Sequence, residues 1–270
     1  VSNSSLSNSY IKGVTRKAIF LNKPLNLDIA SDIEIKNSTI KKGTIYSNAA
    51  ISGIDVDIMY QNQHNPESEI PDSQQINLNS YISLSGSNNQ LKNNATSSPT
   101  YIHGNVYGIE LRYNPPLEDK PSPHLKLAST IEIKGDVFFH PDAEIVAIKL
   151  LTNSGAPLAP QKNIDTFSNT ALEFSAKPIK LKNIGHFETY RFTLDPSNKA
   201  PLITAENIYL NNRGAVDSTA AFKTSSIEIV GIKGGRPLIA NETFVLMKAT
   251  DHLESEGYEP EISKAVAQQG

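Results

Sequence analysis

Two short segments carry residue types that could do chemistry, and the first is a pair of carboxylates. Asp55 and Asp57 lie two residues apart in Gly53–Ile58. On a strand both would face the same side, where they could bind a divalent cation or act as acid and base. Asp28 and Asp32 could contribute further carboxylates from an adjacent coil. Because any half-buried strand alternates polar and apolar residues, we interpret Asp55 and Asp57 as a solvated strand face.

The second segment, Phe138–Asp142, places His140 close to Asp142. A metal site would need a third ligand, and a catalytic triad would need a serine on a sharp, glycine-flanked turn. We interpret His140–Asp142 as a turn at the end of a strand over Val137–Phe139, since the intervening proline favours a turn. The other histidines are scattered and no phosphate-binding or dinucleotide-binding glycine motif occurs. The sequence therefore predicts no catalytic residue, no metal site and no cofactor.

The overall composition argues against several kinds of partner. The 270 residues carry a formal net charge of −3 and include no cysteine. Phosphate binding needs a clustered basic face, so we predict no nucleic-acid partner. The most apolar run, Ala143–Leu151, is interrupted by Glu144 and Lys149 and is too short to cross a bilayer as a helix.

The elements that must position these residues are short strands. Alternating apolar residues recur along the whole chain, bounded by Gly, Asn, Ser or Pro, and this period of two is typical of half-buried strands. The clearest segments are 33–35, 54–58, 131–133, 145–148, 190–194 and 227–230. One helix is plausible, starting at Pro260, because Ile262, Ala265 and Val266 have helical spacing.

The spacing of these strands suggests their arrangement. The strand centres Ile33, Ile54 and Ile76 follow one another at intervals of roughly twenty residues, and most of the later centres do the same. A sandwich of hairpins shows strand signals at shorter intervals, whereas a solenoid has a coil of fixed length. We predict an all-β fold, a right-handed parallel β-helix with about twenty residues per coil. A sandwich with hairpin topology is the alternative.

Three polar tracts interrupt the strands. Residues 61–75 and 114–124 contain prolines that cannot donate to a sheet, and residues 86–100 are rich in Asn and Ser. We expect all three to project from the stack as loops.

The segment from Ile179 to Leu253 has a different character. It contains an aromatic strand that places Phe187, Tyr190 and Phe192 after Asn183, and it ends in a predicted strand over 242–248 with the motif Thr-Phe-Val-Leu-Met. These two motifs resemble the C-terminal end of the passenger region of classical bacterial autotransporters.

The resemblance implies a division of the chain into β-helix coils over 1–178, a β-rich C-terminal cap over 179–255 that acts as a folding seed, and a linker over 256–270 leading to an outer-membrane barrel that is missing from this sequence. A cap is physically reasonable because a solenoid end leaves backbone groups unpaired. The aromatic residues assigned to this folding cap are Phe187, Tyr190, Phe192, Tyr209, Phe222 and Phe244.

The function that the resemblance implies is a non-enzymatic stalk or adhesin. We expect a monomer on the cell surface of a Gram-negative bacterium, or secreted from it, that contacts surface glycans or proteins and meets the membrane only through the missing barrel. The alternative function is a β-helix carbohydrate-active enzyme, either a polysaccharide lyase or a tailspike-type hydrolase. That alternative requires several carboxylates from successive coils to converge in one cleft.

Overall fold

The structure, a computed structural model, describes residues 2, 4–6, 11–21, 26–41, 49–60, 75–87, 98–114, 124–158, 163–211, 223–235, 242–254 and 262–263. Within these ranges the only helical element is the short 3₁₀ turn η1 (Lys233–Gly235). No helix in this part of the chain has the length and apolar character needed to cross a membrane. The regular structure of the described residues thus consists almost entirely of strands.

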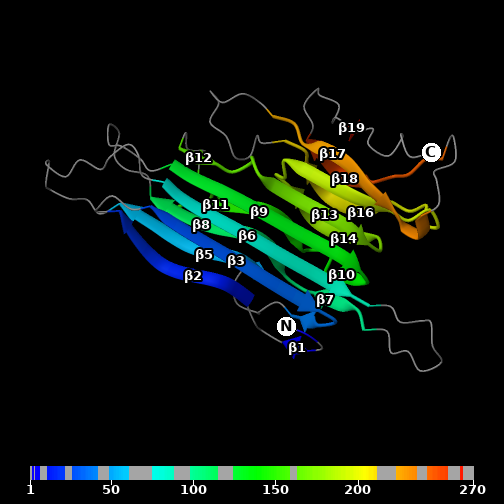
Figure 1. Cartoon of the computed structure of the whole chain (residues 1–270), viewed down its shortest axis with the longest axis horizontal. Helices are drawn as coiled ribbons and strands as arrows, with labels where there is room; N and C mark the ends of the chain where they lie inside the picture. Colours follow the sequence, from blue (N-terminus) through cyan, green and yellow to red (C-terminus); the bar gives the residue numbers. More distant parts are fainter. Residues whose placement is uncertain are drawn as a thin grey trace, which may run out of the picture.

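The strands form three sheets, whose members are stacked in chain order (Figure 1). Sheet 1 contains β3 (Leu27–Lys36), β6 (Gln75–Gly86), β9 (His124–Gly135), β13 (Thr170–Ala176), β15 (Thr189–Leu194), β17 (Ser226–Ile232) and β19 (Ile262–Ser263), with β12 (Ile164–Asp165) also paired to β9. Sheet 2 contains β2 (Ile11–Leu21), β5 (Ala49–Tyr60), β8 (Asn105–Asn114), β11 (Glu144–Leu151), β14 (Ile179–Gly185), β16 (Ile203–Tyr209) and β18 (Met247–Glu254). Sheet 3 is short and contains β1 (Ser5–Leu6), β4 (Thr39–Ile40), β7 (Thr100–Ile102) and β10 (Val137–Phe139).

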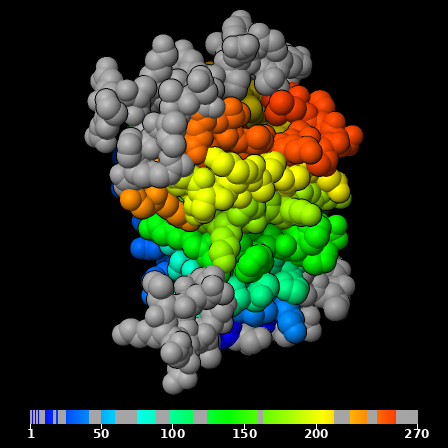
Figure 2. Space-filling view, turned by 90° about the vertical axis from the view of Figure 1, so that its right-hand side faces the viewer, coloured from blue at the N-terminus to red at the C-terminus, as the bar shows by residue number. Residues whose placement is uncertain are grey.

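Every pair of named strands among the described residues is parallel. The chain passes from sheet 2 to sheet 1, through sheet 3 in the first coils, and back to sheet 2. In the space-filling view successive parts of the chain form bands from blue at one end to orange at the other (Figure 2). The predicted parallel β-helix is confirmed, and the sandwich with hairpin topology is wrong.

The predicted coil length, in contrast, is wrong for most coils. Ile33 pairs with Ile82 in the next coil of sheet 1. Ile54, which we expected to lie directly above Ile33, belongs to sheet 2 and pairs there with Ile109. A spacing of about twenty residues therefore separates opposite sheets, and corresponds to half a coil. Only the coil from β13 to β15 on sheet 1 is close to the predicted length, since Leu172 pairs with Tyr190, 18 residues later. The next coil is longer again, because Tyr190 pairs with Ile227.

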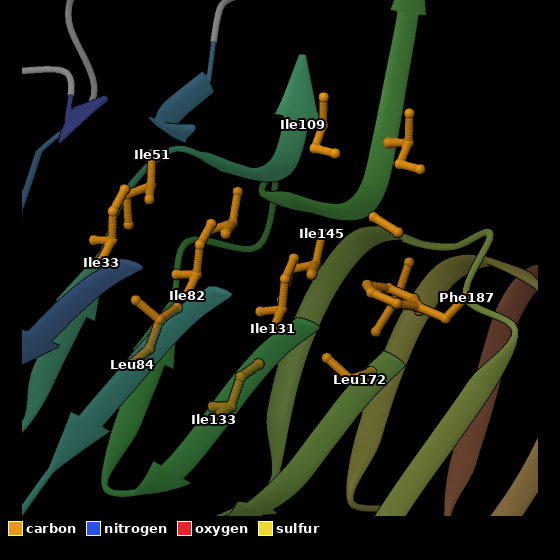
Figure 3. Packing of buried hydrophobic residues seen from close by; sticks show 14 of the residues in the cluster. Ile33, Ile51, Ile82, Leu84, Ile109, Ile131, Ile133, Ile145, Leu172 and Phe187 are labelled. Carbon is orange, nitrogen blue, oxygen red and sulfur yellow. The ribbon is translucent and has the colours of Figure 1, made fainter. Parts of the chain in front are cut away.

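The core lies between sheets 1 and 2 and consists of rows of identical or similar residues. Ile33, Ile82, Ile131 and Leu172 follow one another in register on sheet 1, and none of the four is more than 7% exposed. Ile51, Ile109 and Ile145 belong to the same core from the side of sheet 2 (Figure 3). Each inward residue packs against the equivalent residue of the coils above and below, so the alternation seen in the sequence fixes the inward face of every coil.

A second row of inward positions consists of glycines, and at this row sheets 1 and 2 lie very close together. Gly13, Gly53 and Gly108 lie opposite one another on sheet 2, at the level of serines of sheet 1. A methyl group at Gly53 would come within 1.8 Å of Ser80 Oγ and 2.6 Å of the Gly108 carbonyl oxygen. Only a residue without a side chain fits here, and the glycine row sets the local separation of the sheets.

Beyond residue 178 the same two long sheets continue with β14 to β19. The predicted strand over 242–248 starts later than expected, because β18 begins at Met247. The helix predicted from Pro260 is wrong at Ile262, which is paired with Ile227 as part of β19, and the remaining residues of that segment are outside the described part.

The three polar tracts leave the coils between β5 and β6, between β6 and β7, and between β8 and β9. An antiparallel bridge between Ser87 and Ser98 closes the second tract, and residues 61–74, 88–97 and 115–123 lie outside the described residues. Strands in a sheet are about 4.8 Å apart and rise about 3.3 Å per residue, so the described stack from β3 to β19 is roughly 30 Å long and its longest strands roughly 40 Å. These coils by themselves form a block that is not longer than it is wide.

Candidate functional site

The outer face of sheet 2 carries a cluster of charged side chains around Arg112. The Arg112 guanidinium lies 2.9 Å from Asp55 Oδ1 and 3.2 Å from Asp57 Oδ1, and it also contacts Glu110. Lys12 from β2 forms a further ion pair with Asp55. Three consecutive coils thus supply the five members of this Arg112 cluster, because β2, β5 and β8 are neighbours in the sheet.

The prediction of a solvated strand face is therefore only half correct. Asp55 and Asp57 do alternate with the buried Ile54 and Val56, as expected. Asp55, however, is only 4% exposed and is held by two cations. A buried carboxylate has lost most of its hydration, and the two cationic partners compensate for that loss.

Glu110 lies opposite Asp55 in the register of β5 and β8 and is also buried. Burial, followed by repulsion from Asp55, raises the pKa of Glu110 above its ordinary value, and Arg112 only partly offsets both effects. Glu110 is thus a carboxyl group that holds its proton more tightly than an exposed glutamate.

Beside this cluster lies an open groove, which we call the Glu144 groove, with a volume of about 540 Å³. Its floor is formed by polar side chains of β8, β11 and β14, namely Asn105, Tyr107, Glu110, Glu144, Lys149 and Asn183. Its rim includes the loop that follows β11, where Leu151 and Pro157 form an antiparallel bridge, and it also includes Asp142. The groove combines hydrogen-bond donors, acceptors and both signs of charge.

Glu144 is the centre of the hydrogen bonds in this groove. Lys149 Nζ donates to Glu144 Oε1 at 2.9 Å and Asn183 Nδ2 to Oε2 at 3.2 Å, while the Tyr107 hydroxyl donates to Oε1. Burial acts to raise the pKa of Glu144, but the hydrogen bonds from Tyr107 and Lys149 outweigh it and hold this pKa below its ordinary value. Burial and the adjacent Glu144 charge raise the pKa of Tyr107. The groove therefore contains a carboxyl group that gives up its proton more readily than an exposed glutamate.

Side-chain amides continue the row of hydrogen-bonding groups from Glu144 along the stack of coils. Glu144 faces Asn183, and Asn183 faces Asn207 on the next strand. Asn207 Nδ2 donates to Asn183 Oδ1 at 2.8 Å, and Asn105 Oδ1 accepts from the Glu144 backbone amide at 3.1 Å. The outer face of sheet 2 thus presents an in-register row of amide and carboxylate groups.

The structure places His140 and Asp142 in a turn, as predicted. The Ala143 amide donates to the His140 carbonyl oxygen at 2.9 Å, and the Asp142 amide donates to His140 Nδ1 at 3.2 Å. No three His, Asp or Glu residues of the described ranges come together in a way that could hold a metal ion. Neither Asp55 with Asp57 nor His140 with Asp142 has the ligands of a cation site among these residues.

The aromatic residues assigned to the folding cap lie in several environments. Phe187, Tyr190 and Phe192 are completely buried in the core, and the rings of Phe187 and Tyr190 meet edge to face at 5.5 Å. Tyr209 is on the outer face of sheet 2, stacked on His186 at 5.1 Å, and Phe244 lies at the margin of the core near Lys199. Phe222 lies outside the described residues. Their role as a folding seed stays a prediction.

Sequence reasoning missed Glu110, Arg112, Glu144 and Lys149. The available signal was the alternation within β8, where Glu110 and Arg112 are interspersed with Ile109, Leu111 and Tyr113. That signal shows which residues face outward, but it does not show that they lie opposite Asp55, since this depends on register.

Comparisons of the chain with protein-family models, with curated proteins and with solved structures found no match. The resemblance to autotransporter passengers therefore rests on the sequence motifs alone.

Proposed function

We propose that this protein is a non-enzymatic surface protein of the adhesin type, a passenger-like β-helix displayed on or secreted from a Gram-negative cell, which binds saccharides in the Glu144 groove as a monomer. The observation that carries the proposal is the floor of this groove. Asn105, Asn183 and Lys149 supply amide and ammonium donors, while Glu144 and Asp142 supply acceptors. Sugars carry closely spaced hydroxyl groups that both donate and accept, so such a mixed polar surface suits them.

The rigidity of the site supports this function. The groove is built on strands, and its side chains are already fixed by hydrogen bonds to one another. A site with fixed side chains loses little conformational entropy when a ligand binds. We therefore assign the described coils to contact with a ligand.

The test is binding of the purified chain to a printed array of linear oligosaccharides, including neutral, N-acetylated and uronic acid sugars. We expect the chain to bind a subset of the array, and Asn183→Ala and Lys149→Met each to reduce that binding at least tenfold. The matched control is Lys134→Met, since Lys134 also forms an ion pair with a glutamate, but on the outer face of sheet 1. A chain that binds no oligosaccharide, or equal binding by Lys149→Met and Lys134→Met, would refute the proposal.

A carbohydrate-active enzyme is the second candidate, favoured by one specific observation. Glu110 and Glu144 both line the groove, and their surroundings move their pKa values in opposite directions. A carboxylic acid beside a carboxylate is the pair that glycoside hydrolysis requires. Incubation of the chain with the oligosaccharides it binds, followed by measurement of new reducing ends, distinguishes the two functions. Release that is abolished by Glu110→Gln would establish the enzyme.

A further inference from the structure

A pair of exposed aromatic rings lies on the outer face of sheet 3. Tyr101 on β7 and Phe138 on β10 are opposite each other in register, and their rings stack with centroids 5.3 Å apart and an interplanar angle of 21°. Tyr101 is 40% exposed and Phe138 is 37% exposed. Large aromatic side chains bury a substantial apolar area when another molecule covers them. The exposed parts of these two rings are therefore available for contact with a ligand.

Each ring also has a face that no other ring covers. On β4 the residue opposite Tyr101 is Thr39, whose side chain is much smaller than a ring. On the other side β10 is the last strand of sheet 3 within the described residues, so no further strand of that sheet continues the row beyond Phe138. Along the stack the two rings are thus flanked by Thr39 and by the start of β14, which passes next to β10, and no third ring continues the row among the described residues.

The aromatic pair is continuous with the Glu144 groove. His103 and His140 form the next row on the same face, with ring centroids 6.1 Å apart. His140 Nδ1 lies 3.5 Å from Asp142 Oδ2, and Asp142 lines the groove. A ligand that leaves the groove past Asp142 would therefore meet the imidazoles and then the aromatic rings.

The chemistry of this surface indicates its ligand. Two rings bordered by two imidazoles and a carboxylate form a small apolar area with a polar edge, which is too small for a membrane surface. A pyranose ring has an apolar face of C–H groups and a rim of hydroxyls, and it matches an aromatic face with polar neighbours.

We propose that Tyr101 and Phe138 form a second saccharide subsite, which stacks against sugar rings of the same oligosaccharide whose neighbouring units occupy the Glu144 groove. This inference rests on the proposed function, since it extends the same binding surface around the corner between sheets 2 and 3. It predicts that affinity increases with chain length until both subsites are filled.

The experiment compares wild type with the double variant Tyr101→Ala/Phe138→Ala on an array that contains each sugar series from monomers to hexamers. We expect wild type to bind long members at least tenfold more tightly than short ones, and the double variant to keep the short members and lose this gain. Val230→Ala is the control, since Val230 is another exposed apolar residue, on β17. If wild type binds nothing, the proposed function fails. If wild type binds but the gain with length is absent, or is unchanged in the double variant, only the second subsite fails.

A fluorescence measurement keeps the inference testable if the double variant does not fold. The chain contains no tryptophan, so Phe138→Trp introduces one fluorophore at the subsite. We expect hexamers to shift or quench its emission and monomers to leave it unchanged. Emission that stays constant while hexamers bind on the array would overturn the inference.

Discussion

Asp55 and Glu110 lie directly opposite each other on neighbouring strands of sheet 2, and the guanidinium of Arg112 contacts both carboxylates. Like charges at opposed positions destabilise a sheet. Both side chains are more than 90% buried, so water contributes little to their stabilisation. Arg112 thus offsets the repulsion between two acidic side chains that this register places side by side.

We expect Arg112→Met to reduce the free energy of unfolding by about 3 kcal/mol or more, since removing one partner of a buried ion pair leaves the others uncompensated. Arg191→Met is the matched control. Arg191 also contacts two carboxylates, those of Glu173 and Glu228, but all three side chains are 34% to 39% exposed. Such pairs contribute about 1 kcal/mol at most. Urea unfolding followed by circular dichroism measures both variants, and equal losses would contradict the prediction.

Because the pKa of Glu110 is raised in the folded state, the free energy of unfolding depends on pH. The folded state binds the Glu110 proton more tightly than the unfolded chain, so this group stabilises the fold below its ordinary pKa of 4.5, and the contribution is lost as the pH rises through the folded pKa. Glu110→Gln removes this titration. We expect the stability of wild type relative to Glu110→Gln to increase as the pH is lowered toward 4.5. Thermal unfolding at a series of pH values tests this, and a difference independent of pH would count against it.

Glu144 should show the opposite behaviour because its folded pKa is lowered. The contribution of this carboxylate is present above the ordinary pKa of 4.5 and is lost as the pH falls through the lower folded value. Relative to Glu144→Gln, wild type should therefore lose stability as the pH falls from 4.5 through the lower folded value. The same unfolding series serves both variants, each as the control for the other. Slopes of the same sign would show that one of the two carboxyl environments is misassigned.

The sequence predicted strands far better than it predicted coils. Residues 33–35, 54–58 and 131–133 are strands with the expected inward face, because alternation reflects burial on one side. Alternation does not distinguish one sheet from another. Ile33 and Ile54 have the same local pattern, yet they face the core from opposite sheets. For the first coils the coil length was therefore taken as about half its real value.

The candidate site could not be predicted for a related reason. Asp55 was recognised as an outward carboxylate, but its partner Arg112 lies one whole coil further along the chain. Strand β6 of sheet 1, strand β7 of sheet 3 and the segments that connect them separate the two residues, and nothing local specifies the offset between β5 and β8. Glu144 was noted only as an interruption of an apolar run, because its hydrogen-bond donors Tyr107 and Asn183 belong to other coils.

Because Gly53 lies against Ser80, we predict that the stability of the protein is unusually sensitive to substitution of Gly53. A methyl group at Gly53 would overlap both Ser80 Oγ and the carbonyl oxygen of Gly108, and the carbonyl cannot move without disturbing the next coil. We expect Gly53→Ala to cost about 3 kcal/mol, the upper end for overpacking a core. Gly231→Ala is the control, since the nearest atom there would be Thr193 at 3.6 Å, and we expect a change within about 0.5 kcal/mol. Similar stability of the two variants in urea would show that the sheets can separate at the glycine row.

The serines opposite the glycine row offer a substitution that should stabilise the protein. Ser31, Ser80 and Ser129 occupy equivalent positions on β3, β6 and β9, and their hydroxyl groups are buried without a hydrogen-bond partner among the described residues. An unsatisfied buried hydroxyl costs about 1 to 3 kcal/mol. Ser80→Ala removes that cost while leaving the Cβ in place, so we expect the free energy of unfolding to rise by about 1 kcal/mol.

Ser225→Ala is the matched control for this substitution. Ser225 is as deeply buried as Ser80, but its hydroxyl donates to the Phe187 carbonyl oxygen at 2.7 Å. Its removal leaves a buried acceptor unpaired, and we expect a loss of about 1 kcal/mol. Opposite signs for the two Ser→Ala variants in urea unfolding would support the assignment. A destabilised Ser80→Ala would indicate that the serine row is hydrogen-bonded, for example by buried water, and that the two sheets meet through a polar rather than a purely steric contact.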